Sequence, residues 1–223
     1  LAQEQFTNID TNFAHVTFIV TDGYQTITPI DVVVNIKGHT DTAAYDGAEH
    51  TVTGYTATTE STLYDVANVR FSGTASASRT YVGTTYMGLA QEQFTNIDTN
   101  FAHVTFNVTD GYQTITPIDV VVTIKGHTDT TDYDGNAHTV TGYTATANST
   151  LYDVDDDFTF SGNSTATRTD AGTTYMGLAA DQFTNTNDNF DMVTFIVTDG
   201  WQTIEPRPVT LTSATDSKIY DGT

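Results

Sequence analysis

Apolar and polar residues alternate in short stretches along the whole chain. In the first of them, Val16, Phe18 and Val20 take every second position, a spacing that puts their side chains on one face of a β-strand. A later copy of this stretch keeps the apolar face and has Asn107 where the first copy has Ile19. An amide side chain there predicts that the opposite face is at least partly wet.

Turn residues separate the predicted strands. An Asp-Gly pair between two strand patterns predicts a β-hairpin, and Pro belongs at the start or edge of a strand because it has no N–H to donate. The hairpins are expected at Asp22-Gly23, Asp110-Gly111 and Asp199-Gly200. In the first copy we expect strands at 16–21, 24–28, 32–36, 51–58, 62–66, 71–74, 77–81 and 84–89, and one helical turn at 89–94.

The chain also repeats itself. Residues 1–42 and 89–130 differ only where Ile19 becomes Asn107 and Asn35 becomes Thr123, and a third copy begins at Leu178. The spacing is 88 residues from the first copy to the second and 89 from the second to the third. A fixed period of this length predicts a row of similar small domains, an arrangement poorly suited to a single catalytic site.

Prolines at equivalent positions mark the predicted domain junctions. Seven or eight short strands in about 88 residues favour an all-β fold of tandem Ig-like β-sandwiches, with β-grasp repeats as the alternative. The short Pro-containing connections favour an elongated array. The chain lacks an initiator Met and begins within a repeat, so we expect an internal part of a longer polypeptide. With junctions at Pro29, Pro117 and Pro206, the predicted domains are 1–30 (the end of a preceding repeat), 31–118, 119–207 and 208–223 (the start of the next).

Charge and composition exclude several classes of binding partner. The 223 residues include 28 acidic and 7 basic ones, a net charge of −21. Nucleic acid is a poor partner because phosphate binding needs clustered Lys and Arg, and an anionic membrane surface is disfavoured for the same reason. The absence of cysteine excludes disulfides, thiolate zinc sites and cysteine nucleophiles. No window resembles a membrane span or signal peptide, so we expect no membrane insertion, and neighbouring repeats are the expected partners.

A Tyr-Asp-Gly turn recurs shortly after a predicted strand, at residues 45–47, 133–135 and 220–222. With the Val-Thr-Asp-Gly-Tyr and Ile-Thr-Pro segments, it resembles the Tyr-Asp-Gly-type tandem repeats of large bacterial surface proteins and adhesins. The resemblance covers the whole chain. It implies an extracellular protein at the bacterial cell surface or attached to the cell wall, with repeats that form a stalk. It supplies no catalytic residues.

Acidic and histidine clusters are the candidate metal sites. An acidic run offers oxygen ligands for calcium, although it lacks the Gly and terminal Glu of an EF-hand loop and also fits a solvated loop. Three aspartates near the second junction are another calcium option, and two histidines with nearby aspartates permit a zinc hypothesis, although surface histidines fit as well. These sets are Asp153, Asp155, Asp156 and Asp157; Asp129, Asp132 and Asp134; and His39 and His50 with Asp41 and Asp46.

Other chemistry finds little support in the sequence. Lys37 and Lys125 suggest a Lys–Asn isopeptide crosslink, but the strand phase turns both side chains outward, away from the apolar setting that the reaction needs. Asn107, Asn148 and Asn163 match the N-glycosylation pattern, as chance allows in a chain rich in Thr and Asn. Neither a nucleophile elbow nor a phosphate-binding Gly loop is present. Aromatic residues are expected to pack in the core or in hairpins.

Two functions remain open after these exclusions. The first is a non-enzymatic structural repeat that acts as a stiff stalk or fibre segment, in which each domain contacts only its neighbours. The alternative is an adhesin module that binds host glycan or protein by multivalent avidity. An enzyme is not expected, and no cofactor is expected apart from the calcium considered above.

Overall fold

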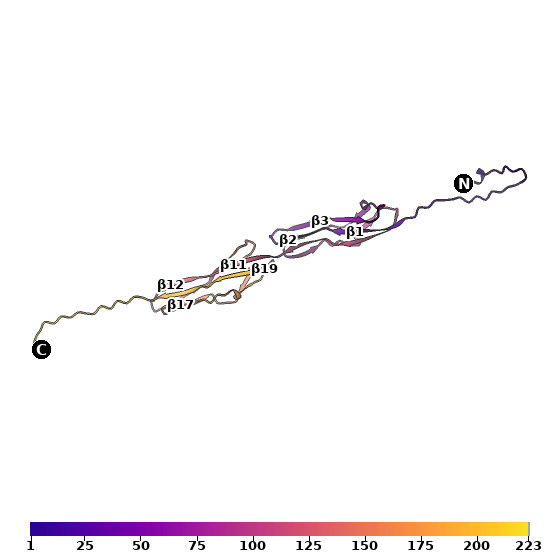
Figure 1. Cartoon of the computed structure of the whole chain (residues 1–223). Helices are drawn as coiled ribbons and strands as arrows, with labels where there is room; N and C mark the ends of the chain where they lie inside the picture. The colour runs from indigo at the N-terminus through magenta and orange to yellow at the C-terminus, as the bar shows by residue number, and fades with distance from the viewer. Residues whose placement is uncertain (223) are drawn as a thin grey trace. The chain divides into compact units, whose positions relative to one another are not determined.

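The computed structural model describes residues 1–222 and shows an all-β protein, as predicted (Figure 1). The helical elements in this range are 3₁₀ turns of three residues: η1 (Gln3–Gln5), η2 (Val66–Asn68), η3 (Gln91–Gln93) and η4 (Ala180–Gln182). The contacts of the described residues divide the chain into two compact units. The first consists of 1–39, 53–76 and 87–111, and the second of 40–52, 77–86 and 112 onward.

In the first unit, the strand that follows Pro29 lies at the centre of a sheet. This strand, β1 (Ile30–Gly38), pairs antiparallel with β4 (Tyr55–Thr59) and parallel with β9 (Phe101–Thr109). A separate antiparallel pair joins β5 (Val69–Phe71) to β8 (Phe94–Asn96). Val32, Val34 and Ile36 alternate as buried residues along β1, which confirms the strand phase predicted for this segment.

The second unit begins with the other strands of the same repeat. Here β10 (Tyr112–Thr116) lies between β2 (Thr40–Ala44), to which it is parallel, and β7 (Gly83–Tyr86), to which it is antiparallel. Another two-stranded sheet joins β3 (His50–Thr53) and β6 (Ser76–Arg79). Figure 1 labels β1, β2 and β3 in the purple part of the ribbon.

The following repeat has the same topology and lies wholly in the second unit. Its buried residues form two clusters, a larger one that includes Val122, Ile124, Tyr152 and Phe190 and a smaller one made of Ala166, Met176 and Leu178. Its sheets are β14 (Tyr143–Ala147)–β11 (Ile118–Gly126)–β19 (Phe190–Thr198), β12 (Thr128–Asp132)–β20 (Trp201–Glu205)–β17 (Gly172–Tyr175), β13 (His138–Thr141)–β16 (Thr165–Arg168) and β15 (Phe158–Phe160)–β18 (Phe183–Asn185).

The predicted Asp-Gly hairpins are wrong. β9 and β10 flank Asp110-Gly111 but belong to different sheets, and Gly111 does not adopt the positive φ of a type I′ turn. Instead, its backbone passes so close to Gly38 that a Cβ on Gly38 would lie 2.6 Å from the Gly111 Cα. The Asp110 carboxylate accepts hydrogen bonds from the Gly88 and Leu89 amides, both at 3.0 Å. The pair therefore carries the chain from one sheet to another.

Some predicted strands also differ from the structure. Residues 16–21 and 24–28 form no strand, whereas the matching residues 104–109 and 112–116 lie in β9 and β10. Residues 62–66 form a turn that leads into η2, whose first turn is capped by Asp65 accepting from the Ala67 amide at 2.9 Å. The predicted strand 51–58 divides into β3 and β4 at Gly54, where φ is +89°.

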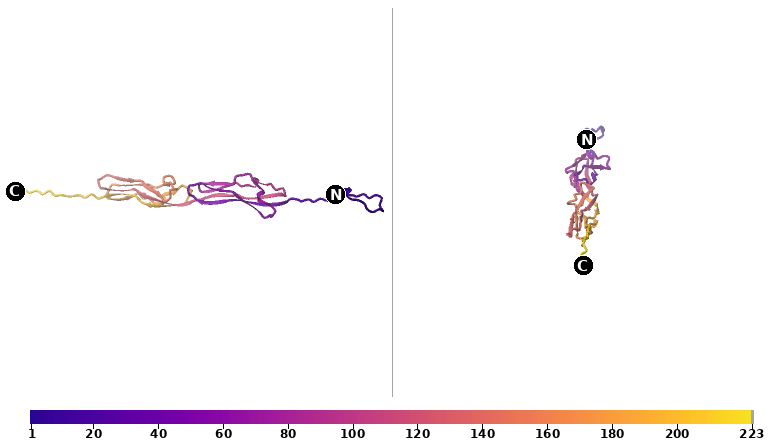
Figure 2. Two further views of the ribbon diagram at one scale, coloured as in Figure 1. Left: turned by 90° about the horizontal axis from the view of Figure 1, so that it is seen from above. Right: turned by 90° about the vertical axis from the view of Figure 1, so that its left-hand side faces the viewer.

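Residues 1–29 and 206–222 form no strand. Residues 206–222 have no strand assignment and are drawn as a thin yellow trace in Figure 2. The predicted domains 31–118 and 119–207 each span most of one strand set, whereas the compact units divide the first set between them. These domain limits and the Ig-like arrangement of the sheets therefore stay predictions.

Candidate functional site

The four aspartates of the predicted calcium site lie in the loop before β15. Asp157 accepts a hydrogen bond from the Asp153 amide at 2.8 Å, and Asp153 accepts one from the Asp155 amide at 2.9 Å, so two of the carboxylates hold the turn together. The Asp155 and Asp156 side chains are exposed. Within residues 1–222, no three His, Cys, Asp or Glu side chains gather closely enough to hold a metal ion. The calcium site stays a prediction without further support.

A buried tyrosine anchors this loop to the core. The Tyr152 hydroxyl lies 3.0 Å from the Asp157 carbonyl oxygen and 3.2 Å from Asn185 Oδ1, and its single proton is shared between these two acceptors. Burial, with a smaller contribution from the charge of Asp157, raises the pKa of Tyr152 to about 12. The hydroxyl therefore stays protonated and remains a donor at neutral pH. The acidic run is thus an exposed loop that Asp157 and Tyr152 hold against the second repeat.

The alternative aspartate set also has local partners. Asp129 accepts from Gln202 Nε2 at 3.0 Å, whereas Asp134 accepts from the Asn136 amide at 2.8 Å and bonds to His138 Nε2 at 3.0 Å. Asp132 is exposed. Hydrogen bonds from the Asn136 backbone and side chain, followed by that from His138, lower the pKa of Asp134 to about 2. These aspartates serve separate turns and strands.

The two histidines of the zinc hypothesis do not converge. His39 Nδ1 lies 2.8 Å from the Thr53 carbonyl oxygen, and its Nε2 lies 3.2 Å from Thr56 Oγ1. His50 Nε2 lies 3.0 Å from Asp46 Oδ1 in the Tyr-Asp-Gly turn. The Ala48 amide, and next the His50 side chain, lower the pKa of Asp46. Each imidazole thus fixes its own turn or strand end.

The lysines considered for a crosslink lie where the strand phase predicted. Lys37 in β1 and Lys125 in β11 are both exposed, and each follows a fully buried isoleucine. Among the glycosylation matches, Asn107 lies on the exposed face of β9, and Asn148 Oδ1 accepts from the Val121 amide at 2.9 Å. The crosslink and the glycan attachment remain without support from these positions.

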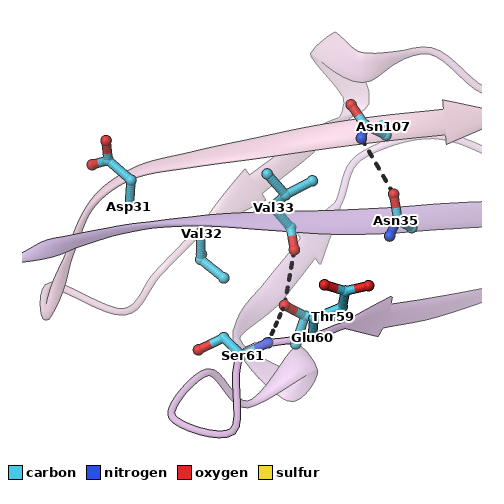
Figure 3. Close-up of a pocket in the computed structure, with 8 residues that line it drawn as sticks. All are labelled: Asp31, Val32, Val33, Asn35, Thr59, Glu60, Ser61 and Asn107. Atoms are coloured by element: carbon cyan, nitrogen blue, oxygen red, sulfur yellow. Dashed lines mark hydrogen bonds between the residues drawn. The ribbon is translucent and has the colours of Figure 1, made fainter.

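A shallow groove of about 410 Å³ lies on the exposed face of the first unit (Figure 3). Asn107 Nδ2 donates to Asn35 Oδ1 at 3.3 Å along one side of it. On the other side, the Thr59 hydroxyl donates to the Val33 carbonyl oxygen at 2.8 Å. The groove presents amides, carboxylates and a partly exposed valine to solvent. It is lined by Asp31, Val32, Val33, Asn35, Thr59, Glu60, Ser61 and Asn107.

The paired residues beside this groove differ in the second repeat. Asn35 pairs with Asn107 across β1 and β9, whereas Thr123 pairs with Ile196 at the same position of β11 and β19. The sequence indicated that these positions are special, because residues 1–42 and 89–130 differ only at Ile19 versus Asn107 and at Asn35 versus Thr123. Sequence reasoning missed that two of these residues are neighbours. The groove contains hydrogen-bonding groups for a polyhydroxylated ligand.

A buried polar cluster was also missed. Gln113 is fully buried in β10, and its Nε2 donates to Asp41 Oδ2 at 3.1 Å. Arg79, in the separate β3–β6 sheet, donates to the Val82 carbonyl oxygen at 2.6 Å and to Oγ1 of Thr85 at 3.2 Å, and Thr85 pairs with Gln113. Arg168 and Gln202 repeat these contacts in the next repeat. Recurrence in both repeats indicates that the cluster supports the sheets.

Within the described residues, no helix is both long and apolar enough to cross a membrane. The chain was compared with protein-family models, curated proteins and solved structures, and no match was found in any of the three.

Proposed function

We propose that this chain is a non-enzymatic structural repeat of a bacterial extracellular surface protein, acting as a stiff stalk or fibre segment. One observation carries the proposal. β10 ends at Thr116 and β11 begins at Ile118, so Pro117 alone separates the last strand of one repeat from the first strand of the next. Proline has a nearly fixed φ and restricts the residue before it, which leaves this connection few rotatable bonds.

Charge and repetition support the same proposal. Near-identical copies add length without adding a new site, so copy number sets the reach of the array. A net charge of −21 keeps neighbouring molecules soluble and apart. The resemblance of the Tyr-Asp-Gly segments to repeats of bacterial surface proteins supports a location at the cell surface or in the cell wall.

Spin-label distance measurements test the stiffness. The chain has no cysteine, so Lys37→Cys together with Lys125→Cys places one label on each repeat. We expect a narrow distance distribution in this pair, and a broad one after a flexible Gly-Ser segment is inserted between Pro117 and Ile118. An unmodified junction that gives a distribution as broad as the insertion variant would contradict the stalk proposal.

The groove of the first repeat favours a second candidate function, an adhesin module that binds glycan. Its amide and carboxylate groups suit sugar hydroxyls. Avidity would come from further repeats that keep this asparagine pair, since the second repeat has Thr123 and Ile196 there. A glycan array probed with the wild-type chain tests this candidate. Asn35→Thr with Asn107→Ile installs the residues of the second repeat and serves as the matched control. Binding lost in that variant supports the candidate, and a wild-type chain that binds no glycan removes it.

A further inference from the structure

The first Tyr-Asp-Gly turn contacts the core of the following repeat. The residues involved all belong to the second compact unit. The Tyr45 ring meets the Phe190 ring edge-on, with centroids 5.8 Å apart and planes at 82°. Tyr45 also stacks on Tyr81, with centroids 6.4 Å apart. Phe190 is part of the buried core of the second repeat, and Tyr45 packs against that core. A tyrosine of one repeat thus covers the end of the next.

A hydrogen bond accompanies this ring contact. The Val82 amide donates to Asn189 Oδ1 at 2.9 Å. Asn189 is held in place for this role, because its own Nδ2 donates to Asn187 Oδ1 at 2.8 Å and leaves its oxygen free to accept. The turn also approaches Leu151: a Cβ on Gly47 would lie 3.1 Å from Leu151 Cδ2. The contact therefore combines an aromatic pair, an aliphatic neighbour and a directional hydrogen bond.

The turn itself is rigidly built. Asp46 Oδ1 accepts from the Ala48 amide at 2.9 Å and bonds to His50 Nε2 at 3.0 Å. The Tyr45 amide donates to the Thr116 carbonyl oxygen at 2.9 Å. Gly47 has a φ of +79°, a conformation that other residues rarely adopt. Asp and Gly thus form the turn, and Tyr45 is the residue that it presents.

We infer that the Tyr-Asp-Gly turn is the docking element of each repeat, and that its partner is the Asn-Phe pair at the start of the penultimate strand of the following repeat. The inference rests on the proposed stalk function, for which it supplies the contact that fixes one repeat against the next. Tyr45 binds by its ring. Asp46 and Gly47 hold the turn, and Asn189 fixes the register.

The two repeats differ at the positions that this inference concerns. Leu151 is partly buried in the second repeat, whereas its counterpart Leu63 is 74 % exposed. Tyr45 is partly buried, whereas its counterpart Tyr133 is 41 % exposed.

The second turn nevertheless has the same internal bonds. Its Asp134 accepts from the Asn136 amide at 2.8 Å and pairs with His138 at 3.0 Å. The Tyr133 amide donates to the Glu205 carbonyl oxygen at 2.8 Å. The turn at 133–135 therefore presents a docking face, and the occupant that fits it is the Asn-Phe pair of another copy of this repeat.

Amide exchange at Val82 tests the inference on the whole chain, because this N–H reports the hydrogen bond of the joint directly. We expect slow exchange in the wild type, and exchange faster by about tenfold in both Asn189→Ala and Tyr45→Ala. Tyr133→Ala is the matched control, since it makes the same change in the second turn and should leave Val82 protected. Amides of β11 and β19 should exchange slowly in every variant, which shows that the repeat stays folded.

Two results would overturn the inference. One is a Val82 amide that exchanges at the same rate in the wild type and in Asn189→Ala. The other is a Tyr133→Ala variant that accelerates exchange of the Val82 amide as much as Tyr45→Ala does.

The spin-label distances between positions 37 and 125 separate this inference from the stalk proposal. A protected Val82 amide with a broad distance distribution supports docking while removing the stiff stalk. A narrow distribution with an unprotected Val82 amide assigns the stiffness to Pro117 and removes docking.

Discussion

Phe106 and Asn107 are neighbours in β9 whose side chains lie on opposite faces of the sheet. Phe106 is 6 % exposed and packs near Phe94, with ring centroids 6.0 Å apart, whereas Asn107 is exposed. Removing a buried phenylalanine ring leaves a cavity, so Phe106→Ala should lower the free energy of unfolding by about 3–5 kcal/mol. Asn107→Ala should change it by less than about 0.5 kcal/mol, as at other surface positions. Chemical denaturation of both variants measures the difference, and the reverse order would mean that the strand phase is wrong.

The Asp134 carboxylate makes the second Tyr-Asp-Gly turn sensitive to acid. Its pKa is about 2 in the folded protein against an ordinary value of 3.8, so folding favours the ionised form. The stabilisation is complete above pH 4 and is lost as the pH falls towards 2. We expect an NMR titration of the side chain to give a midpoint near 2. Asp134→Asn should lack this component of the pH dependence of unfolding.

The first turn provides a natural comparison. Asp46 has Ala48 where Asp134 has Asn136, so Asp46 lacks the side-chain hydrogen bond that Asn136 donates to Asp134 at 3.2 Å. Asn136→Ala should therefore raise the pKa of Asp134 while keeping it below the ordinary value, because the backbone amide and His138 still donate. A midpoint unchanged by Asn136→Ala in the same titration would show that the amide side chain has no part in the shift.

At the scale of the elements, the crossing of two backbones at Gly111 fixes where the strands change sheets. A Cβ on Gly111 would lie 2.7 Å from Met87 Sδ and 2.9 Å from the Gly38 carbonyl carbon. Because backbone cannot move aside as a flexible side chain does, Gly111→Ala should destabilise the chain by about 1–3 kcal/mol or more. Thermal or chemical unfolding measures this cost.

The chain contains a matched control for this substitution. Gly23 has the same neighbours in sequence as Gly111, but a Cβ there would meet nothing within 4 Å. Gly23→Ala should leave the unfolding transition where it is. Equal effects of the two substitutions would mean that local propensity, and not the close crossing, explains the cost at Gly111.

The strands could be predicted from the sequence better than their pairing. Period-two alternation located β1 and β9 with the right face buried, because alternation is a local property of the chain. The hairpins were wrong because Asp110 and Gly111 occur together for separate reasons. The carboxylate binds the Gly88 and Leu89 amides, and the glycine has no room for a side chain. Such reasons depend on residues about 20 and 70 positions away in the sequence, which a local turn rule does not include.

The same limit applies to the candidate site. The Asn35–Asn107 pair and the buried amide of Gln113 depend on strand partners about 70 residues away. Gln113 is a polar residue on the same strand face as the buried Ile115. Asp41 in β2 accepts from Gln113 Nε2, whereas Gln113 Oε1 has no hydrogen-bond partner among the described residues. Without the order of the strands, no pattern within either segment indicates these contacts.

At the scale of the whole molecule, two nearly identical segments differ in secondary structure. Residues 16–21 and 104–109 differ only at Ile19 and Asn107, yet only the second lies in a strand. β9 has β1 beside it in parallel register, whereas residues 16–21 pair with no strand among the described residues. Tertiary pairing therefore decides whether this sequence becomes a strand, as expected where intrinsic β-propensity is weak and dependent on context.

Limited proteolysis with chymotrypsin tests this difference directly. Tyr24 is 92 % exposed and Leu211 is 93 % exposed, and both lie in segments without strand pairing. A protease needs locally unfolded backbone, so cleavage should occur first within 1–29 and after 205, leaving a fragment close to 30–205. Mass spectrometry of a time course identifies the cleavage sites. The cleavage rates at Phe106 in β9 and at the equivalent Phe18 in the first copy provide an internal comparison. Phe18 should be cleaved early and Phe106 late.

Equal cleavage rates at these two residues at a low protein concentration would show that residues 16–21 are protected without the strand that β9 requires. Protection of Phe18 that appears only at a high concentration would indicate that a second molecule supplies that strand.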